Sequence, residues 1–407
     1  MASIPNRAWL GVSQVSASVS NVLIVFAAAA FLPTSDIGAI GLAFSGYLIA
    51  LAVVRGVVGE PALLNHAIGG NASEMASGAL IVGTIVSLAL LGPILAIDGN
   101  HSLALTVSVA LTPILCVQDV LRYASFAQER PKGAAASDLA WVLGTAVTIA
   151  ISYIARRVSV SGLVVGWSVA GTVAAVVICA NMLGGWPRFR DLRRGWSSLF
   201  QWRRQRFNLS IDSIATSAVI QVAALQVTQF GGLAAGGVAR IVQTAHGPAT
   251  LLFSAMYVDG VWTANRNSRD PRLILRAALR MAISLATVSV IVSVVFVAVP
   301  AGLGRRLLGE TFATSRGPMM MYAATQVAAA FGTAAVFALR LMGKSSTRIR
   351  LLWAVSVVLI VPLGAGWYGA GGYFAALTLA NTVAAVLWWM RFRAGLRSAA
   401  TKEPRNE

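Results

Sequence analysis

A few ionisable and amide side chains lie inside long apolar stretches, and they are the residues best suited to chemistry. On a helix predicted over 235–258, Gln243, His246 and Thr250 share one face, with Arg240 close by. A fixed guanidinium and a titratable imidazole suit a path for an anionic group such as a phosphate. The alternative is that Arg240 extends outward to the membrane surface or pairs with a helix C-terminus.

Two further helices, predicted over 9–32 and 207–230, are unusually polar for apolar surroundings. On the first, one face carries Gly11, Gln14, Ser18 and Asn21. On the second, one stripe and its neighbours carry Asn208, Asp212, Ser213, Thr216, Ser217 and Gln221. Since unpaired polar groups are costly in hydrocarbon, these faces must meet protein or water. Interhelical hydrogen bonding and a hydrated central cavity are both open, and the cavity is the functional interpretation.

Charged residues also gather toward the ends of several predicted helices: Arg55, Glu60, Asp119, Arg122, Asp138 and Asp212. Asp119 and Arg122 are three residues apart, so a local ion pair is expected. Asp138 is expected to be half solvated or to cap a helix N-terminus. Asp212 lies within a polar stripe, and its protonation during a transport cycle is the functional hypothesis.

Several kinds of catalytic site are missing from the sequence. The phosphate-binding loop G-x-x-x-x-G-K-[ST] and the zinc motif H-E-x-x-H do not occur, and the three histidines are scattered at positions 66, 101 and 246. Cys116 and Cys179 lack metal-binding spacing and are expected to be small packed residues. We therefore expect no cofactor, no metal site and no enzyme activity.

The elements that position these residues are membrane-spanning helices. Hydrophobic residues make up 57% of the 407-residue chain and charged residues 11%, and the mean hydropathy is +0.74. Runs such as 78–97 reach the roughly 20 residues that a spanning helix needs. Twelve spans are predicted: 9–32, 37–58, 76–97, 102–126, 134–155, 160–184, 207–230, 235–258, 276–300, 316–340, 348–367 and 370–391.

The predicted organisation is an all-α protein with two six-helix lobes around a central cavity. Residues 1–184 form the first lobe, 185–206 a basic linker, 207–391 the second lobe and 392–407 a tail. Most of the 32 Lys and Arg residues fall on one side, so both termini are expected in the cytoplasm. The net charge of +18 therefore reflects orientation and membrane lipids, with no nucleic acid as partner. Aligning Gly41 with Gly237 also suggests that the halves are repeats.

Two runs carry a family resemblance, together with the helix number and the polar helices 9–32 and 207–230. They are "IGAIGLAFSGYLIALAVVRGVVGEPAL" at 37–63 and "QDVLRYASFAQERPKGAAASDLAW" at 118–141. The chain resembles the Wzx-type polysaccharide flippases of the multidrug/oligosaccharidyl-lipid/polysaccharide exporter superfamily. The resemblance implies export of a polyprenyl-pyrophosphate-linked oligosaccharide across a bacterial inner membrane by alternating access. It also implies H⁺ or Na⁺ coupling and a functional link to glycosyltransferases and a polymerase.

The predicted site follows from the polar pattern and this resemblance. The residues predicted to bind substrate are Arg240, His246, Arg55, Gln243, Gln14, Asn21 and Gln221, and those predicted to couple transport to an ion are Asp212 and Asp119. A multidrug-type exporter of the same superfamily is the main alternative, although cation exporters favour acidic cavities. The basic turn of major-facilitator transporters is missing after the second helix. A polysaccharide polymerase or ligase is a further alternative, against which the short outer loops argue.

Overall fold

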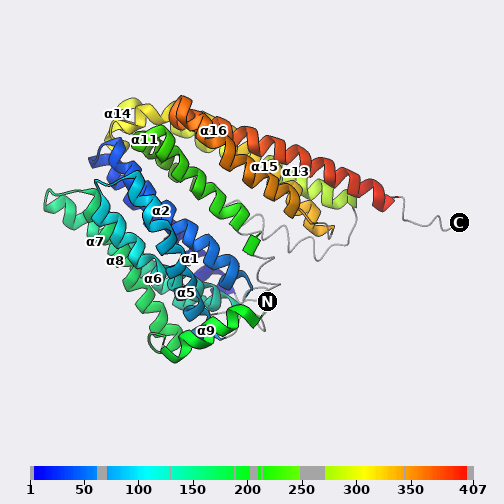
Figure 1. Ribbon diagram of the computed structural model, residues 1–407. Helices are drawn as coiled ribbons and strands as arrows, with labels where there is room; N and C mark the ends of the chain where they lie inside the picture. Colours follow the sequence, from blue (N-terminus) through cyan, green and yellow to red (C-terminus); the bar gives the residue numbers. More distant parts are fainter. Residues whose placement is uncertain are drawn as a thin grey trace.

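The structure is a computed structural model that describes residues 4–61, 71–128, 130–187, 189–201, 210–211, 214–247, 271–342 and 345–400. Within these ranges the chain is helical and contains no strand, as the sequence predicts. Figure 1 shows two groups of helices that lie close together at one end and diverge toward the other.

The first half contains six long helices. They are α1 (Ile4–Phe31), α2 (Thr34–Val54) with its π-helical continuation η1 (Arg55–Gly59), α5 (Ala72–Ile97), α6 (Ser102–Ala127), α7 (Pro131–Ile154) and α8 (Val160–Leu183). Helix α9 (Phe189–Gln201) follows and packs on α5, where Gly195 lies against Ser77 and Gly78. The predicted basic linker is therefore largely an amphipathic helix, with Trp196 and Phe200 exposed.

The described part of the second half contains η2 (Ile214–Ala218), α11 (Val219–Ala245), α13 (Pro271–Ala298), α14 (Ala301–Leu308), α15 (Thr311–Leu341) and α16 (Thr347–Ala400). Two of these helices are interrupted. In α11, Gly232 has φ 86°, and in α16, Gly369 has φ 56°, a backbone conformation that glycine adopts without steric cost. Ten described helices are long and apolar enough to cross a membrane, and these two breaks divide them into twelve segments, as predicted.

Two boundaries differ from the sequence prediction. The segment 301–315, expected to be a loop, contains the short helix α14, which begins after Pro300 and ends at Gly309. It was missed because it is amphipathic: Leu308 is buried, whereas Arg305 and Arg306 are exposed. Helix α16 also continues through the predicted tail to Ala400, with Phe392 buried in the second core. The end of the eighth predicted span, 248–258, lies outside the described residues.

The two halves form separate cores that meet along α2 and α11. Small residues allow this approach: a Cβ added to Gly38 would lie 2.0 Å from the Leu233 carbonyl oxygen, and one added to Gly237 would lie 2.0 Å from that of Thr34. The Thr34 and Thr311 hydroxyls hydrogen-bond nearby at 2.7 Å. These contacts lie at the end opposite both termini and α9, where the two groups of ribbons are closest (Figure 1).

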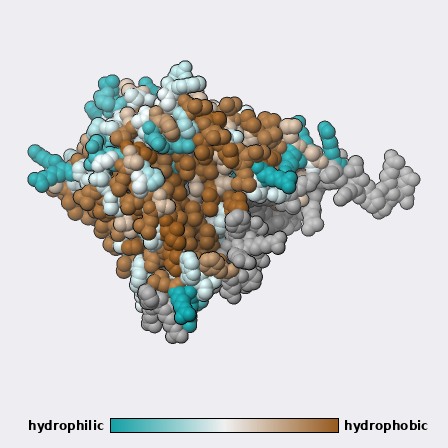
Figure 2. All heavy atoms as spheres, in the orientation of Figure 1, coloured by the Kyte–Doolittle hydropathy of each residue, from teal (hydrophilic) through white to brown (hydrophobic). Residues whose placement is uncertain are grey.

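The surface supports a membrane-spanning arrangement. Figure 2 shows hydrophobic atoms in a broad central band, with hydrophilic atoms gathered toward the ends. Large apolar side chains on α7 are exposed, including Leu143, Val147, Ile151 and Ile154. A band of this kind is expected where protein faces lipid, because lipid chains are as apolar as these side chains.

Candidate transport site

Arg240 lies on α11 where the two halves meet. Its guanidinium carbon stacks over the Phe44 ring of α2, 4.4 Å from the ring centroid. Gly41, one turn before Phe44, lies beside the stem, and a Cβ there would be in ordinary van der Waals contact with Arg240 Cβ at 3.6 Å. The cation therefore crosses from the second half onto the first and is held by an aromatic face.

The charge of Arg240 is unusual for its depth. The side chain is half-buried, its Nε has no hydrogen-bond partner, and no carboxylate among the described residues forms an ion pair with it. A guanidinium inside a membrane span is costly unless it is paired or hydrated. An anionic ligand between the halves would complete its coordination, so Arg240 is the strongest anion-binding candidate in the described chain.

His246 and Gln243 point into the second half instead. His246 is 1% exposed, its Nε2 lies 3.0 Å from the Ser293 hydroxyl, and its ring packs edge-on against Tyr322 with centroids 4.7 Å apart. Gln243 Nε2 donates to the Tyr373 hydroxyl at 2.9 Å. The expected grouping of these two residues with Arg240 at an accessible surface is therefore not found, and Thr250 lies outside the described residues.

A buried network of four charges occupies the first half. Arg55 donates two hydrogen bonds of 2.7 Å to Asp119, from Nε to Oδ2 and from Nη2 to Oδ1. Arg122 donates to the same Asp119 at 3.0 Å and to Asp138 at 2.9 Å. Two guanidinium groups and two carboxylates thus balance one another, as buried charges require.

This network confirms one expectation and corrects another. The local Asp119–Arg122 ion pair is present. Asp138 is neither half solvated nor an N-terminal cap, because it is 1% exposed and lies about two turns inside α7, whose N-cap is Arg130. It accepts hydrogen bonds from Ser13 of α1 and from Gln118 of α6, at 2.9 Å from the latter, so it joins three helices.

Arg55 is the part of the network nearest to solvent. Its side chain is 34% exposed, whereas Asp119 is 1% exposed. It begins the π-helical turn η1, a feature that often marks functional sites. Phe44 and Arg55 are about three turns apart, roughly 17 Å, on one face of the α2 axis. The charge of Arg55 is already balanced by Asp119, unlike that of Arg240.

The polar stripe of α1 is not sealed by packing. Gly11 and Gln14 are exposed, whereas Ser13 and Ser20 on the other side are buried. Asn21 Oδ1, together with Gln221 Oε1 on α11, is buried without a hydrogen-bond partner. Asp212, the predicted coupling residue, lies outside the described residues. In the described part of the chain, no group of three or more His, Cys, Asp or Glu residues is arranged to hold a metal ion.

Sequence reasoning missed the partners of these charges. Phe44 under Arg240 and Ser13 beside Asp138 are separated from them along the chain by 196 and 125 residues. The sequence indicates only indirectly that these partners exist, because a charge within a membrane span needs a partner or water. Cys116 and Cys179 are free and buried, as expected.

Structural comparison relates this arrangement to solved transporters. No protein-family model matches the chain, and no curated protein matches it. An inward-facing multidrug resistance transporter of the MATE family and MOP superfamily is similar with a TM-score of 0.70 at 14% identity, covering 98% of this chain and 99% of that one. The lipid II flippase MurJ, in an inward closed conformation, is similar with a TM-score of 0.67 at 10% identity, covering 96% and 88%.

The chain has the fold of MATE transporters and of the MurJ flippase. An outward-facing MATE transporter of the same superfamily gives a lower TM-score of 0.58 at 14% identity, covering 99% of this chain and 98% of that one. These proteins are transporters and a flippase rather than enzymes, and the apolar helices indicate a multi-pass membrane protein.

Proposed function

We propose that this chain is a flippase that moves a polyprenyl-pyrophosphate-linked oligosaccharide from the inner to the outer leaflet of a bacterial plasma membrane. The observation that carries the proposal is Arg240, a cation at the junction of the two halves without a carboxylate partner among the described residues. A pyrophosphate supplies oxygens that a planar guanidinium binds bidentately. The similarity to the lipid II flippase MurJ supports this substrate class.

The same arrangement supports transport by alternating access. The halves touch through Gly38, Gly237 and Thr311 at one end, and they diverge toward the end that carries the termini and α9 (Figure 1). With both termini in the cytoplasm, the end at which the ribbons diverge faces inward, and the higher TM-score to the inward-facing MATE transporter supports an inward-facing state. The oligosaccharide headgroup would enter between the halves while the lipid chain remains in the membrane.

Coupling to H⁺ or Na⁺ would involve the buried carboxylates. Asp119 is held by two arginines, whereas Asp138 bridges α1, α6 and α7 through Ser13, Gln118 and Arg122. A change in the charge of Asp138 would alter how α1 packs on α7, which makes it a coupling candidate beside Asp119 and Asp212. Substituting Asp119 or Asp212 by Asn should slow transport without preventing membrane insertion.

The proposal is tested in cells by depleting the protein and labelling the lipid-linked oligosaccharide in each leaflet. We expect the labelled pool to accumulate on the inner face and re-expression of the wild type to restore export. Unchanged arrival at the outer face after depletion would contradict the flippase role. Polymer length separates a polymerase from a flippase, because a polymerase defect shortens polymer without trapping units inside.

A multidrug-type exporter is the second candidate, and the TM-score of 0.70 to a MATE transporter favours it. Lipophilic cations are the expected cargo of such an exporter, and Arg240 at the junction repels them. Uptake of a fluorescent cation into proteoliposomes distinguishes the two functions, since the flippase proposal expects no protein-dependent uptake.

A further inference from the structure

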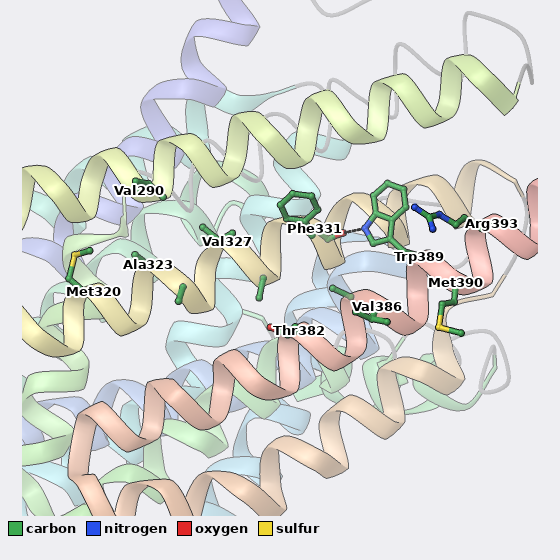
Figure 3. Close-up of a pocket in the computed structure, with 13 residues that line it drawn as sticks. Val290, Met320, Ala323, Val327, Phe331, Thr382, Val386, Trp389, Met390 and Arg393 are labelled. Atoms are coloured by element: carbon green, nitrogen blue, oxygen red, sulfur yellow. Dashed lines mark hydrogen bonds between the residues drawn. The ribbon is translucent and has the colours of Figure 1, made fainter.

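A groove between helices of the second half has a lining that does not include Arg240. It has a volume of about 740 Å³ and lies between α13, α15 and α16 (Figure 3). Its lining comprises Val290, Met320, Ala323, Ala324, Val327, Ala328, Phe331, Thr382, Ala385, Val386, Trp389, Met390 and Arg393. This volume is within the range of small-molecule sites.

The walls of the groove are apolar, and its polar groups are nearly all satisfied within the protein. The Thr382 hydroxyl donates to the carbonyl of Thr378 at 2.8 Å, and Trp389 Nε1 donates to the Phe331 carbonyl at 3.1 Å. Apolar side chains such as Val386 and Met390 remain exposed by 53% and 62%. The groove therefore offers its occupant apolar contact and little hydrogen bonding along its length.

One end of the groove is different because Arg393 lies there beside Trp389 (Figure 3). The Arg393 side chain is exposed, and it forms no ion pair with the described residues. The lining of α16 from Thr382 to Arg393 runs about 17 Å, close to half the thickness of the hydrocarbon core. A ligand that fits has an apolar chain about one leaflet long and an anionic group at the end.

We propose that the groove binds an anionic phospholipid, with an acyl chain along α15 and α16 and the phosphate on Arg393. The charge of Arg393 complements a phosphate, and the apolar walls within the spans α15 and α16 suit an acyl chain. In the orientation expected from the Lys and Arg distribution, Arg393 lies at the cytoplasmic surface, so the lipid belongs to the inner leaflet. The proposal does not depend on which substrate the protein transports.

Trp389 provides a reporter inside the groove. Purified full-length protein is reconstituted in phosphatidylcholine bilayers with increasing fractions of phosphatidylglycerol brominated on its acyl chains, which quench tryptophan on contact. The difference between the wild type and Trp389→Phe isolates quenching at this position. We expect brominated phosphatidylglycerol to reach half-maximal quenching at about a fivefold lower fraction than brominated phosphatidylcholine, the effect of one arginine near a membrane surface.

Two variants, each with a control, distinguish a specific lipid-binding site from non-specific contact with bulk lipid. Arg393→Gln should abolish the preference for phosphatidylglycerol, whereas Arg348→Gln, at an exposed arginine outside the groove, should keep it. Ala324→Phe fills the groove and should remove quenching of Trp389 by both lipids, whereas Ala146→Phe, on the exposed face of α7, should not. Equal midpoints for the two lipids in the wild type, or a preference that survives Arg393→Gln, would overturn the proposal.

Discussion

Replacing Arg240 by Gln separates ligand binding from stability. The variant keeps a polar side chain but removes the cation that stacks over Phe44. A hydrogen bond to a charged group contributes about 1.5–3 kcal/mol, so binding of a pyrophosphate should weaken by about 10- to 100-fold. The suitable ligand is a short-chain isoprenyl pyrophosphate such as farnesyl pyrophosphate, titrated calorimetrically into purified protein, with farnesol as the uncharged comparison.

Stability should respond differently from binding. The glutamine loses a cation–π contact of about 0.5–2 kcal/mol, but it also removes a half-buried guanidinium whose buried Nε lacks a partner. These effects oppose each other, so we expect the thermal unfolding temperature to remain near that of the wild type. Arg240→Lys keeps the charge but loses the planar stacking and the bidentate geometry, and its affinity should be intermediate.

Arg316 offers a matched control. Its guanidinium carbon also lies over a phenylalanine ring, 4.8 Å from the centroid of Phe312, but it donates to the Val299 carbonyl at 2.5 Å. Arg316→Gln should leave pyrophosphate affinity unchanged and lower stability. If Arg240→Gln binds the pyrophosphate as tightly as the wild type while Arg316→Gln behaves as expected, Arg240 does not hold the headgroup and the reasoning fails.

Three other experiments test the close approach of the two halves, the buried charge network and the exposed face of α1. Gly237→Leu should separate α2 from α11 and yield little monodisperse protein in gel filtration, because its side chain meets the backbone of α2. Arg122→Gln should lower the free energy of unfolding by about 3–5 kcal/mol by leaving a buried carboxylate unpaired, and adding Asp138→Asn should recover part of the loss in a denaturant titration. A cysteine at Gln14 should react with a water-soluble maleimide, whereas one at Ser20 should not.

The native cysteines and a control glycine variant make these outcomes specific. Cys116 and Cys179 are buried, so the unmodified chain should label weakly. Gly302→Leu has open space around its Cβ and should leave the gel-filtration profile of the wild type unchanged. An unreactive cysteine at position 14 would place that face of α1 against lipid rather than water. An unaltered gel-filtration profile for Gly237→Leu would contradict the close approach of the two halves.

The number of apolar spans and most of their described limits could be predicted because their signals are local. Hydropathy defines each apolar run, and the breaks at Gly232 and Gly369 fall where the predicted spans are separated. Amphipathic segments gave a weaker signal: α14 is short, and its arginines lower the hydropathy of the segment. Apolar runs alone therefore do not predict short amphipathic helices such as α14.

The side-chain partners could not be predicted, because hydropathy specifies which segments cross the membrane but not which neighbours they have. Arg55 pairs with Asp119 from a helix 64 residues away, whereas the pair at Asp119 and Arg122 was predictable from its spacing of three residues. For His246, the sequence predicted a role at the site, but the structure places the side chain in the protein interior. Its chemistry suited an anion path, yet Ser293 and Tyr322 enclose it in the second core.

A flippase of the proposed kind carries a lipid-linked anion between leaflets through the junction at Arg240. The most direct measurement uses purified protein in liposomes that contain a polyprenyl-pyrophosphate-linked glycan with a fluorophore on the sugar. A membrane-impermeant reductant then bleaches only the fluorophores that reach the outer leaflet. We predict near-complete bleaching with the wild type, and with Arg240→Gln only the outer-leaflet share lost by protein-free liposomes. Bleaching by folded, reconstituted wild type that equals the protein-free value would contradict the account.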